Sequence, residues 1–448
     1  MSSTSLKEKA INGTIWTIFG YGTSQVLRFG SNLILTRLLA PDLFGLMALV
    51  QIFIRGLSLF SDIGIKPSII RSPHGEEPIF LNTAWSIQVV RGFGLWIACL
   101  IITIPVANYY EEQRLLWLIP IVGFTTIISG FNSTILASLN RRMEFRKIAI
   151  FELGVQIISL AILIGWAWLY PSIWALVGGN LVSVSLIVLF SHKINLEKPN
   201  RFAWDKKAIQ EIVSFGKWIF LSTAMTFLAS EADRILLGKF FSLEMLGIYI
   251  VAFTFADIPR QVSQKISSKV IFPAISQLID LPRKTLKQKI VAKRWKLIML
   301  LSLMVAVLAC FGDLVILALY DDRYQQASWI LPILAIGLWP LLLSTTMDRF
   351  LVAAAKPSYL ALGNFFKFIY MIVGIPLGFL KMGILGVIIV IALNDFPYYV
   401  AINYGLCKEK LNFLWQDFQA TFFLIGTIIA ISFIRANMGL GFAIDGIL

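Results

Sequence analysis

Long apolar stretches fill almost the whole of this chain. Thirteen of them approach the roughly 20 residues that a helix needs to cross the hydrocarbon core of a bilayer. Nine lysine or arginine residues nevertheless lie inside these stretches. A cation near the middle of a membrane helix costs about 2.5 to 3.5 kcal/mol on insertion scales, so several of them indicate an internal, water-filled, cationic cavity. The pattern predicts an all-α, polytopic membrane protein that handles an anion.

The composition excludes several classes of protein. Charged residues make up 14% of the chain and hydrophobic residues 58%, whereas a soluble domain carries about 25% charge. The net charge of +14 is spread over short loops, which indicates contact with anionic membrane lipids and argues against nucleic acid. The cysteines and the two histidines, which lie in loops, have no metal-ligand spacing. We therefore expect no cofactor and no metal.

The apolar stretches define the expected membrane spans. The first helix is too long for the apolar region of a signal peptide, so we expect it to be retained. The predicted spans cover residues 13–38, 43–65, 83–106, 115–139, 148–169, 173–191, 215–238, 246–271, 297–319, 329–354, 359–380, 384–406 and 419–434.

The distribution of positive charge sets the expected orientation. With the N-terminus in the cytoplasm, the inner segments hold 24 lysine and arginine residues and the outer segments six. The outer loops are short, which leaves no room for an external catalytic domain and argues against an enzyme. Between the sixth and seventh spans we expect a connector on the membrane surface, in which Asp205 caps a helix with Ile209, Ile212 and Val213 on one face.

The chain contains an internal repeat. Shifted by 202 residues, LTRLLAPDLFG at 35–45 lies over LGKFFSLEMLG at 237–247, with the basic, acidic and glycine positions kept. Six spans separate the copies, so both halves enter the membrane with the same polarity and form parallel repeats. We expect two six-helix lobes, at 1–204 and 205–410, and a C-terminal extension at 411–448 with one further span.

Several short motifs follow one another along the chain. They are LTRLLAPDLFG at 35–45, DIG at 62–64, NRRMEFR at 140–146, ADRILLGK at 232–239, LGIY at 246–249 and FPA at 272–274. In this order and spacing, over about residues 6–406, the chain resembles the bacterial polysaccharide flippases, which handle O-antigen and exopolysaccharide, of the multidrug/oligosaccharidyl-lipid/polysaccharide exporter superfamily. The resemblance implies a V-shaped pair of lobes that moves a lipid-linked oligosaccharide from the inner to the outer leaflet of the bacterial inner membrane.

The cations inside the spans suit such a substrate. A polyprenyl-diphosphate-linked glycan presents phosphate oxygens, with which the planar guanidinium of arginine pairs in a bidentate manner. The alternative is local pairing, which is favoured where a carboxylate lies three residues away, as for Glu231 with Arg234 and Asp257 with Arg260. The candidate diphosphate contacts are Arg28, Arg55, Arg234, Arg349 and Lys367.

Acidic residues in or beside the spans are candidates for ion coupling. A buried carboxyl group that exchanges H⁺ or Na⁺ can link transport to an ion gradient. The alternative is that such groups are structural partners of neighbouring arginines. The coupling candidates are Asp62, Glu152, Asp233 and Asp348.

Three functions remain open at this point. The first is a flippase working by alternating access, with assembly proteins of polysaccharide export as possible partners. The second is a small-molecule or drug antiporter on the same fold, which the cationic residues argue against. The third is a membrane glycan polymerase or ligase, which the short external loops disfavour.

Overall fold

The computed structural model describes residues 3–194, 199–272, 275, 281–354 and 356–443. These residues form helices and loops, and no strand occurs among them. The chain divides into two compact units, Met1–Phe227 (unit 1) and Leu228–Leu448 (unit 2). Of the predicted features, the last two residues of FPA at 272–274, the connector residues 195–198 and the end of the C-terminal extension at 444–448 lie outside the described residues.

The helices confirm a multi-pass membrane protein. Each predicted span overlaps helical chain, and eight helices in the described part are long and apolar enough to cross a membrane, or nine with one bent pair. The predicted spans at 115–139, 246–271, 329–354 and 384–406 are not continuous, since each is divided between shorter helices or between two successive helices. The predicted lobe boundaries stay predictions; the division between the units falls inside a helix, Lys206–Phe240.

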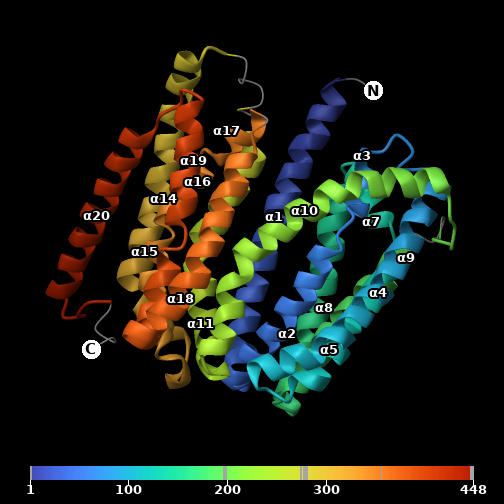
Figure 1. The fold of residues 1–448 in the computed structure, drawn as a ribbon, viewed down its shortest axis with the longest axis horizontal. Coiled ribbons are helices and arrows are strands. Elements are labelled where there is room, and N and C mark those ends of the chain that lie inside the picture. Colours follow the sequence, from blue (N-terminus) through green and yellow to red (C-terminus); the bar gives the residue numbers. More distant parts are fainter. Residues whose placement is uncertain (1–2, 195–198, 273–274, 276–280, 355, 444–448) are drawn as a thin grey trace. The chain divides into compact units, whose positions relative to one another are not determined.

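Unit 1 holds nine helices and the first part of a tenth within the described residues (Figure 1). Helices α1 and α8 lie side by side, because Gly20 has no side chain to separate them; a Cβ there would lie 3.0 Å from that of Ala149. Ser24 Oγ also donates to Gln156 Oε1 at 2.6 Å. The helices are α1 Ser3–Leu38, α2 Pro41–Phe60, α3 Ile65–Arg71, α4 Pro78–Tyr110, α5 Leu115–Gly123, α6 Thr125–Gly130, α7 Ile135–Arg141, α8 Phe145–Leu169, α9 Ile173–Ile194 and α10 Lys206–Phe240.

The fourth predicted span is broken between α6 and α7, and the two parts meet at 58°. A broken helix leaves carbonyl groups without intrahelical partners. Gln88 of α4 compensates, since its Nε2 donates to the carbonyls of Ser129, Gly130 and Asn132 at 3.3, 3.0 and 3.0 Å. The Gln88 amide thus supports the break, together with Trp85, whose Nε1 donates to the Phe131 carbonyl at 3.3 Å.

The connector before α10 and the first turns of α10 pack against α3 and α4 within unit 1. The Ala208 N–H donates to Asp205 Oδ1 at 2.8 Å, which confirms the predicted cap. Ile212 is fully buried against α3 and α4, in a cluster with Ile69 and Phe80. Val213 is 50% exposed, so unit 1 covers the predicted apolar face only in part, and the contact of this face with the membrane surface stays a prediction.

A charged loop follows α3 in the same region. His74 Nδ1 lies 2.7 Å from Glu77 Oε1, and this hydrogen bond raises the pKa of His74 above its usual value of 6.5. Both side chains are exposed. The folded state therefore binds the proton more tightly, so the pair stabilises the loop below pH 6.5 and loses that contribution as pH rises through the raised pKa.

We expect Glu77→Gln to return the pKa of His74 towards 6.5. The measurement is an NMR titration of the two histidines, since the chain has no others. His192 is the internal control, because its Nε2 lies 2.8 Å from the Phe131 carbonyl and not near Glu77. An unchanged His74 titration in the variant would contradict the assignment.

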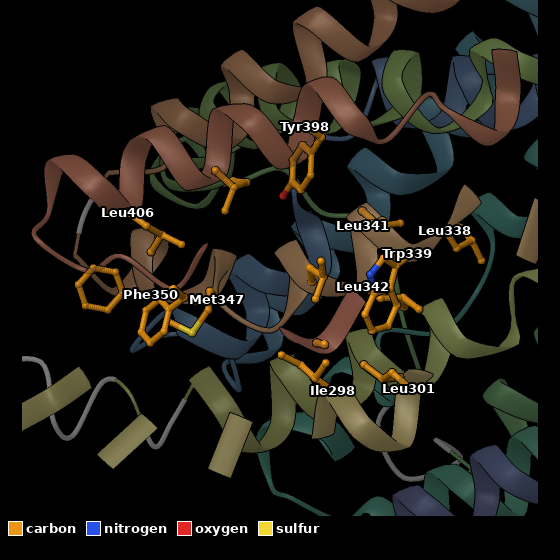
Figure 2. Close-up of a cluster of buried hydrophobic side chains, with 14 of the residues drawn as sticks. Ile298, Leu301, Leu338, Trp339, Leu341, Leu342, Met347, Phe350, Tyr398 and Leu406 are labelled. Atoms are coloured by element: carbon orange, nitrogen blue, oxygen red, sulfur yellow. The ribbon is translucent and has the colours of Figure 1, made fainter. Parts of the chain in front are cut away.

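Unit 2 contains the end of α10 and the remaining helices (Figure 1). Its apolar core joins α14, α16 and α19, and Figure 2 shows Ile298, Leu301, Leu342 and Tyr398 within it. The elements are α11 Leu243–Ala256, α12 Ile258–Ile266, the π-helix η1 Ser267–Ile271, α14 Arg283–Leu319, the 3-10 helix η2 Asp322–Tyr324, α15 Ala327–Gly337, α16 Trp339–Thr345, α17 Asp348–Ala353, α18 Ser358–Ala392, α19 Phe396–Lys408 and α20 Leu414–Asn437.

Helix α20 is fastened to α14 near both ends. Arg294 Nη2 lies 2.6 Å from Asp417 Oδ1, and Arg435 Nη1 lies 2.6 Å from Asp313 Oδ1. Both ion pairs are buried. Buried pairs of this kind fix the register of packed helices when every charge is matched.

The internal repeat reappears in the helix ends. In the first copy α1 ends at Leu38 and α2 begins at Pro41; in the second α10 ends at Phe240 and α11 begins at Leu243. These ends are related by the same shift of 202 residues. The Ser242 hydroxyl caps α11 by accepting from the Met245 N–H at 3.1 Å, whereas Pro41 starts α2.

Candidate functional site

Charged side chains from five segments meet inside unit 2. They come from α10, the turn between α11 and α12, α12, α18 and the turn before α19. We call them the charged cluster, defined as Glu231, Asp233, Arg234, Asp257, Arg260, Lys367 and Asp395.

One side of the charged cluster carries two guanidinium groups on one aromatic ring. The Cζ atoms of Arg234 and Arg260 lie 4.9 and 5.5 Å from the centroid of the Phe253 ring. Arg234 Nη1 pairs with Glu231 Oε2 at 2.8 Å, and Arg260 pairs with Asp257. Both i,i+3 pairs were expected as an alternative to substrate contact, and both are confirmed.

The other side is more deeply buried. Lys367 Nζ donates to Asp395 Oδ1 at 2.5 Å, with both side chains at most 10% exposed. The Tyr249 hydroxyl donates to Asp233 Oδ2 at 2.8 Å. Four carboxylates thus face three cations, so the charged cluster is not the purely cationic site that the intramembrane arginines suggested.

A small cavity opens within the charged cluster. Its volume is about 30 Å³, which is room for about one water molecule or a small ion. Asp233, Arg260, Lys367 and Asp395 line it together with Asn394. Within the described residues, neither Asp233 Oδ1 nor Asn394 Oδ1 has a hydrogen-bond partner. Two acceptor oxygens therefore remain available on residues that line the cavity.

Asp348 and Arg349 lie at the start of α17. Asp348 is 4% exposed and accepts from the Tyr398 hydroxyl at 3.3 Å. Arg349 Nε lies 3.7 Å from Asp348 Oδ1, so these neighbours in sequence do form an ion pair. Adjacent positions inside a helix point about 100° apart, but Asp348 and Arg349 are the first two residues of α17, directly after the break that follows α16.

The candidates in unit 1 occupy different surroundings. Arg28 of α1 and Arg55 of α2 are exposed, as is Glu152 of α8. Asp62 is half-buried, and its Oδ1 accepts from the N–H of Gly64 at 2.8 Å, where φ is 66°. Asp62 thereby holds the left-handed turn before α3, which is a structural role. The structure does not join these four residues into one site.

Sequence reasoning overlooked part of the charged cluster. Arg260 was assigned only to local pairing, and Asp395 was not named as a diphosphate or coupling candidate. The residues beside the charged cluster, Tyr249, Phe253 and Asn394, were not candidates either. The signal for Arg260 was present, since an arginine inside an apolar stretch is unusual. For Asp395 no local signal pointed to Lys367, because the two lie 28 residues apart and meet through the packing of α18 on α19.

Comparison with known proteins places the chain in a family. A family model described as polysaccharide biosynthesis protein matches residues 34–329. The chain belongs to this family. The succinoglycan biosynthesis transport protein ExoT of Rhizobium meliloti is 22% identical over 72% of this chain and 65% of its own length. The lipopolysaccharide biosynthesis protein WzxC of Escherichia coli is 22% identical over 62% of this chain and 56% of its own length. The matches thus cover less than two thirds of either relative.

Solved structures identify the fold. The lipid II flippase MurJ, in an inward closed conformation, superposes with a TM-score of 0.68 at 14% identity and covers 95% of this chain and 93% of MurJ. An inward-facing multidrug resistance MATE family transporter of the MOP superfamily gives 0.65 at 14% identity, covering 86% and 94%. The fold is therefore that of membrane transporters in this superfamily, as the motifs predicted.

Proposed function

We propose that this family member is a flippase that moves a polyprenyl-diphosphate-linked oligosaccharide from the cytoplasmic to the outer leaflet by alternating access. The observation that carries the proposal is the pair of guanidinium groups, Arg234 and Arg260, held on Phe253 inside an apolar unit. Each guanidinium has five N–H donors, and the pairing with Glu231 and Asp257 uses only some of them. The remaining donors suit phosphate oxygens.

The relatives and the topology support this assignment. ExoT is named for succinoglycan biosynthesis transport and MurJ for lipid II flipping, and both names concern glycans or glycolipids at membranes. The charge distribution favours a cytoplasmic N-terminus. The resemblance to bacterial polysaccharide flippases favours a bacterial inner membrane. Proteins of polysaccharide assembly are the proposed partners, since the translocated glycan has to be polymerised or attached by other proteins.

The direct test is translocation of a labelled lipid-linked oligosaccharide by the purified protein in liposomes. Outer-leaflet substrate is quantified with a membrane-impermeant glycosidase, with and without an imposed ion gradient. A parallel arm offers a cationic dye, because the fold is shared with a multidrug transporter. Glycolipid movement without dye movement supports the flippase; dye movement alone contradicts it and favours the antiporter.

We further propose that Asp233 couples transport to H⁺ or Na⁺. Its Oδ1 has no partner in the described part of the chain, and the residue lines a cavity of ion size. Asp348 is the second candidate, since it is buried and only weakly paired at 3.7 Å. Glu152 is a weaker one, because it is exposed.

We expect Asp233→Asn to abolish the stimulation of glycolipid transport by an ion gradient while downhill exchange continues. The asparagine amide has the shape of the carboxylate and can still accept from the Tyr249 hydroxyl. It cannot bind a proton at neutral pH, and it attracts Na⁺ less strongly than a carboxylate does. Asp62→Asn is the matched control, because Asp62 serves a turn. Gradient stimulation that survives Asp233→Asn would exclude Asp233 as the coupling group.

A further inference from the structure

An open groove lies between the first part of α14 and the start of α20, away from the charged cluster. Its volume is about 480 Å³, within the range of small-molecule sites. The groove residues are Lys287, Asn412, Leu414, Trp415 and Phe418. We infer that this groove binds one anionic phospholipid of the surrounding bilayer.

The polar end of the groove suits a phosphate headgroup. Among the described residues, Lys287 is the only charged residue that lines it, and none of their carboxylates pairs with this lysine. Its Nζ lies over the buried Phe413 ring, 6.0 Å from the ring centroid, so the ammonium is held at an aromatic face and keeps N–H donors for a phosphate. Asn412 is exposed beside it, and its NH₂ group takes no part in the hydrogen bond from the Leu414 N–H to Oδ1.

The apolar end suits acyl chains. Trp415 and Phe418 are 71% and 53% exposed, and their rings stack with centroids 5.7 Å apart and planes at 21°. Exposed apolar residues continue along α20 to Phe433. Tryptophan concentrates at the boundary between headgroups and hydrocarbon, so Trp415 marks the level at which α20 enters the membrane.

The groove therefore crosses the boundary of the bilayer with a cation on the polar side and an aromatic pair on the apolar side. A phospholipid has the same order of charge and apolar surface. Lys284 and Lys293 in the first turns of α14 are also exposed and add positive potential to this surface. The choline group of a zwitterionic lipid would place a second cation beside Lys287. The groove should therefore prefer phosphatidylglycerol to phosphatidylcholine.

The test uses the full chain in nanodiscs that contain brominated phosphatidylglycerol or brominated phosphatidylcholine. Bromine quenches nearby tryptophan, and the contribution of Trp415 is obtained by difference from Trp415→Phe. We expect half-maximal quenching at a mole fraction of brominated phosphatidylglycerol about fivefold or more below that of brominated phosphatidylcholine. Lys287→Glu should remove this preference.

The matched control is Lys289→Glu, which makes the same change of charge on the same helix outside the groove. The lipid site is supported if the preference for phosphatidylglycerol is lost in Lys287→Glu and kept in Lys289→Glu. Equal quenching of the wild type by the two lipids, or an equal loss of the preference in both variants, overturns the proposal. Stoichiometric displacement of the phospholipid by a polyprenyl diphosphate also overturns it, because the groove would then belong to the transported substrate. The outcome is separate from the proposed function, since glycolipid translocation is not measured.

Discussion

Replacing Arg294 with methionine should cost about 3 to 5 kcal/mol of folding free energy, the largest stability effect that we expect from a single substitution. Arg294 and Asp417 are each 3% exposed. The guanidinium also donates to Thr346 Oγ1 at 2.8 Å, to Gln416 Oε1 at 2.9 Å and to the Leu343 carbonyl at 3.2 Å. Methionine fills a similar volume but leaves the Asp417 carboxylate buried without its cation.

The effect should extend beyond the contact of α14 with α20. Leu343 belongs to the last turn of α16 and Thr346 to the break between α16 and α17. Asp417 Oδ2 accepts from the Tyr399 hydroxyl of α19 at 2.9 Å. The arginine therefore connects four segments of unit 2. We expect partial loss of protection from hydrogen exchange in α20 before the rest of unit 2 opens.

Chemical or thermal unfolding in detergent measures the predicted loss. Arg323→Met is the matched control, because Arg323 pairs with Asp321 at 2.6 Å with both side chains 39% exposed, and an exposed pair contributes about 0 to 1 kcal/mol. The double variant Arg294→Met, Asp417→Asn should regain much of the stability, since the unpaired charge is gone. If Arg294→Met were no less stable than Arg323→Met, the buried network would not have the assigned role.

The second large effect concerns substrate binding at Phe253. We expect Arg234→Ala and Arg260→Ala each to weaken binding of the lipid-linked diphosphate by about ten- to a hundredfold, since a charge-assisted contact contributes about 1.5 to 3 kcal/mol. Arg→Lys at either position should lose less, because the charge remains while the planar fork is lost. Binding is measured by titrating the purified protein with the glycolipid.

Structural damage has to be separated from lost contact. Arg234→Ala leaves Glu231 unbalanced, so the variant Glu231→Gln, Arg234→Gln removes the pair without a net charge change. If this variant binds the glycolipid weakly but has the unfolding free energy of the wild type, Arg234 contacts the substrate. Restored affinity would instead mean that Arg234 only neutralises Glu231. Alanine at Arg28, Arg55, Arg349 and Lys367 in turn tests the remaining diphosphate candidates.

Local features of the chain were accessible from the sequence. Apolar stretches of bilayer length predicted the helices, because a backbone in hydrocarbon has to satisfy its own hydrogen bonds. The pairs of Glu231 with Arg234 and of Asp257 with Arg260 followed from helical spacing, as did the cap by Asp205. The repeat likewise predicted related helix ends, since the two copies keep the basic, acidic and glycine positions of the turn.

Only the tertiary structure decided which distant charges meet. Two ion pairs, Lys367 with Asp395 and Arg294 with Asp417, form because particular helices pack together. Hydropathy does not distinguish one apolar helix from another, so it could not predict these pairs. The breaks in the spans at 115–139 and 329–354 depend in the same way on side chains elsewhere, such as Gln88, that satisfy the freed carbonyls. The sequence by itself determined the class of protein, the helical regions and the ion pairs between residues three positions apart. Each of these depends on residues that are close together in the chain. The near-neutral charged cluster was decided by the fold, because the energy of a buried charge depends on partners that only packing supplies.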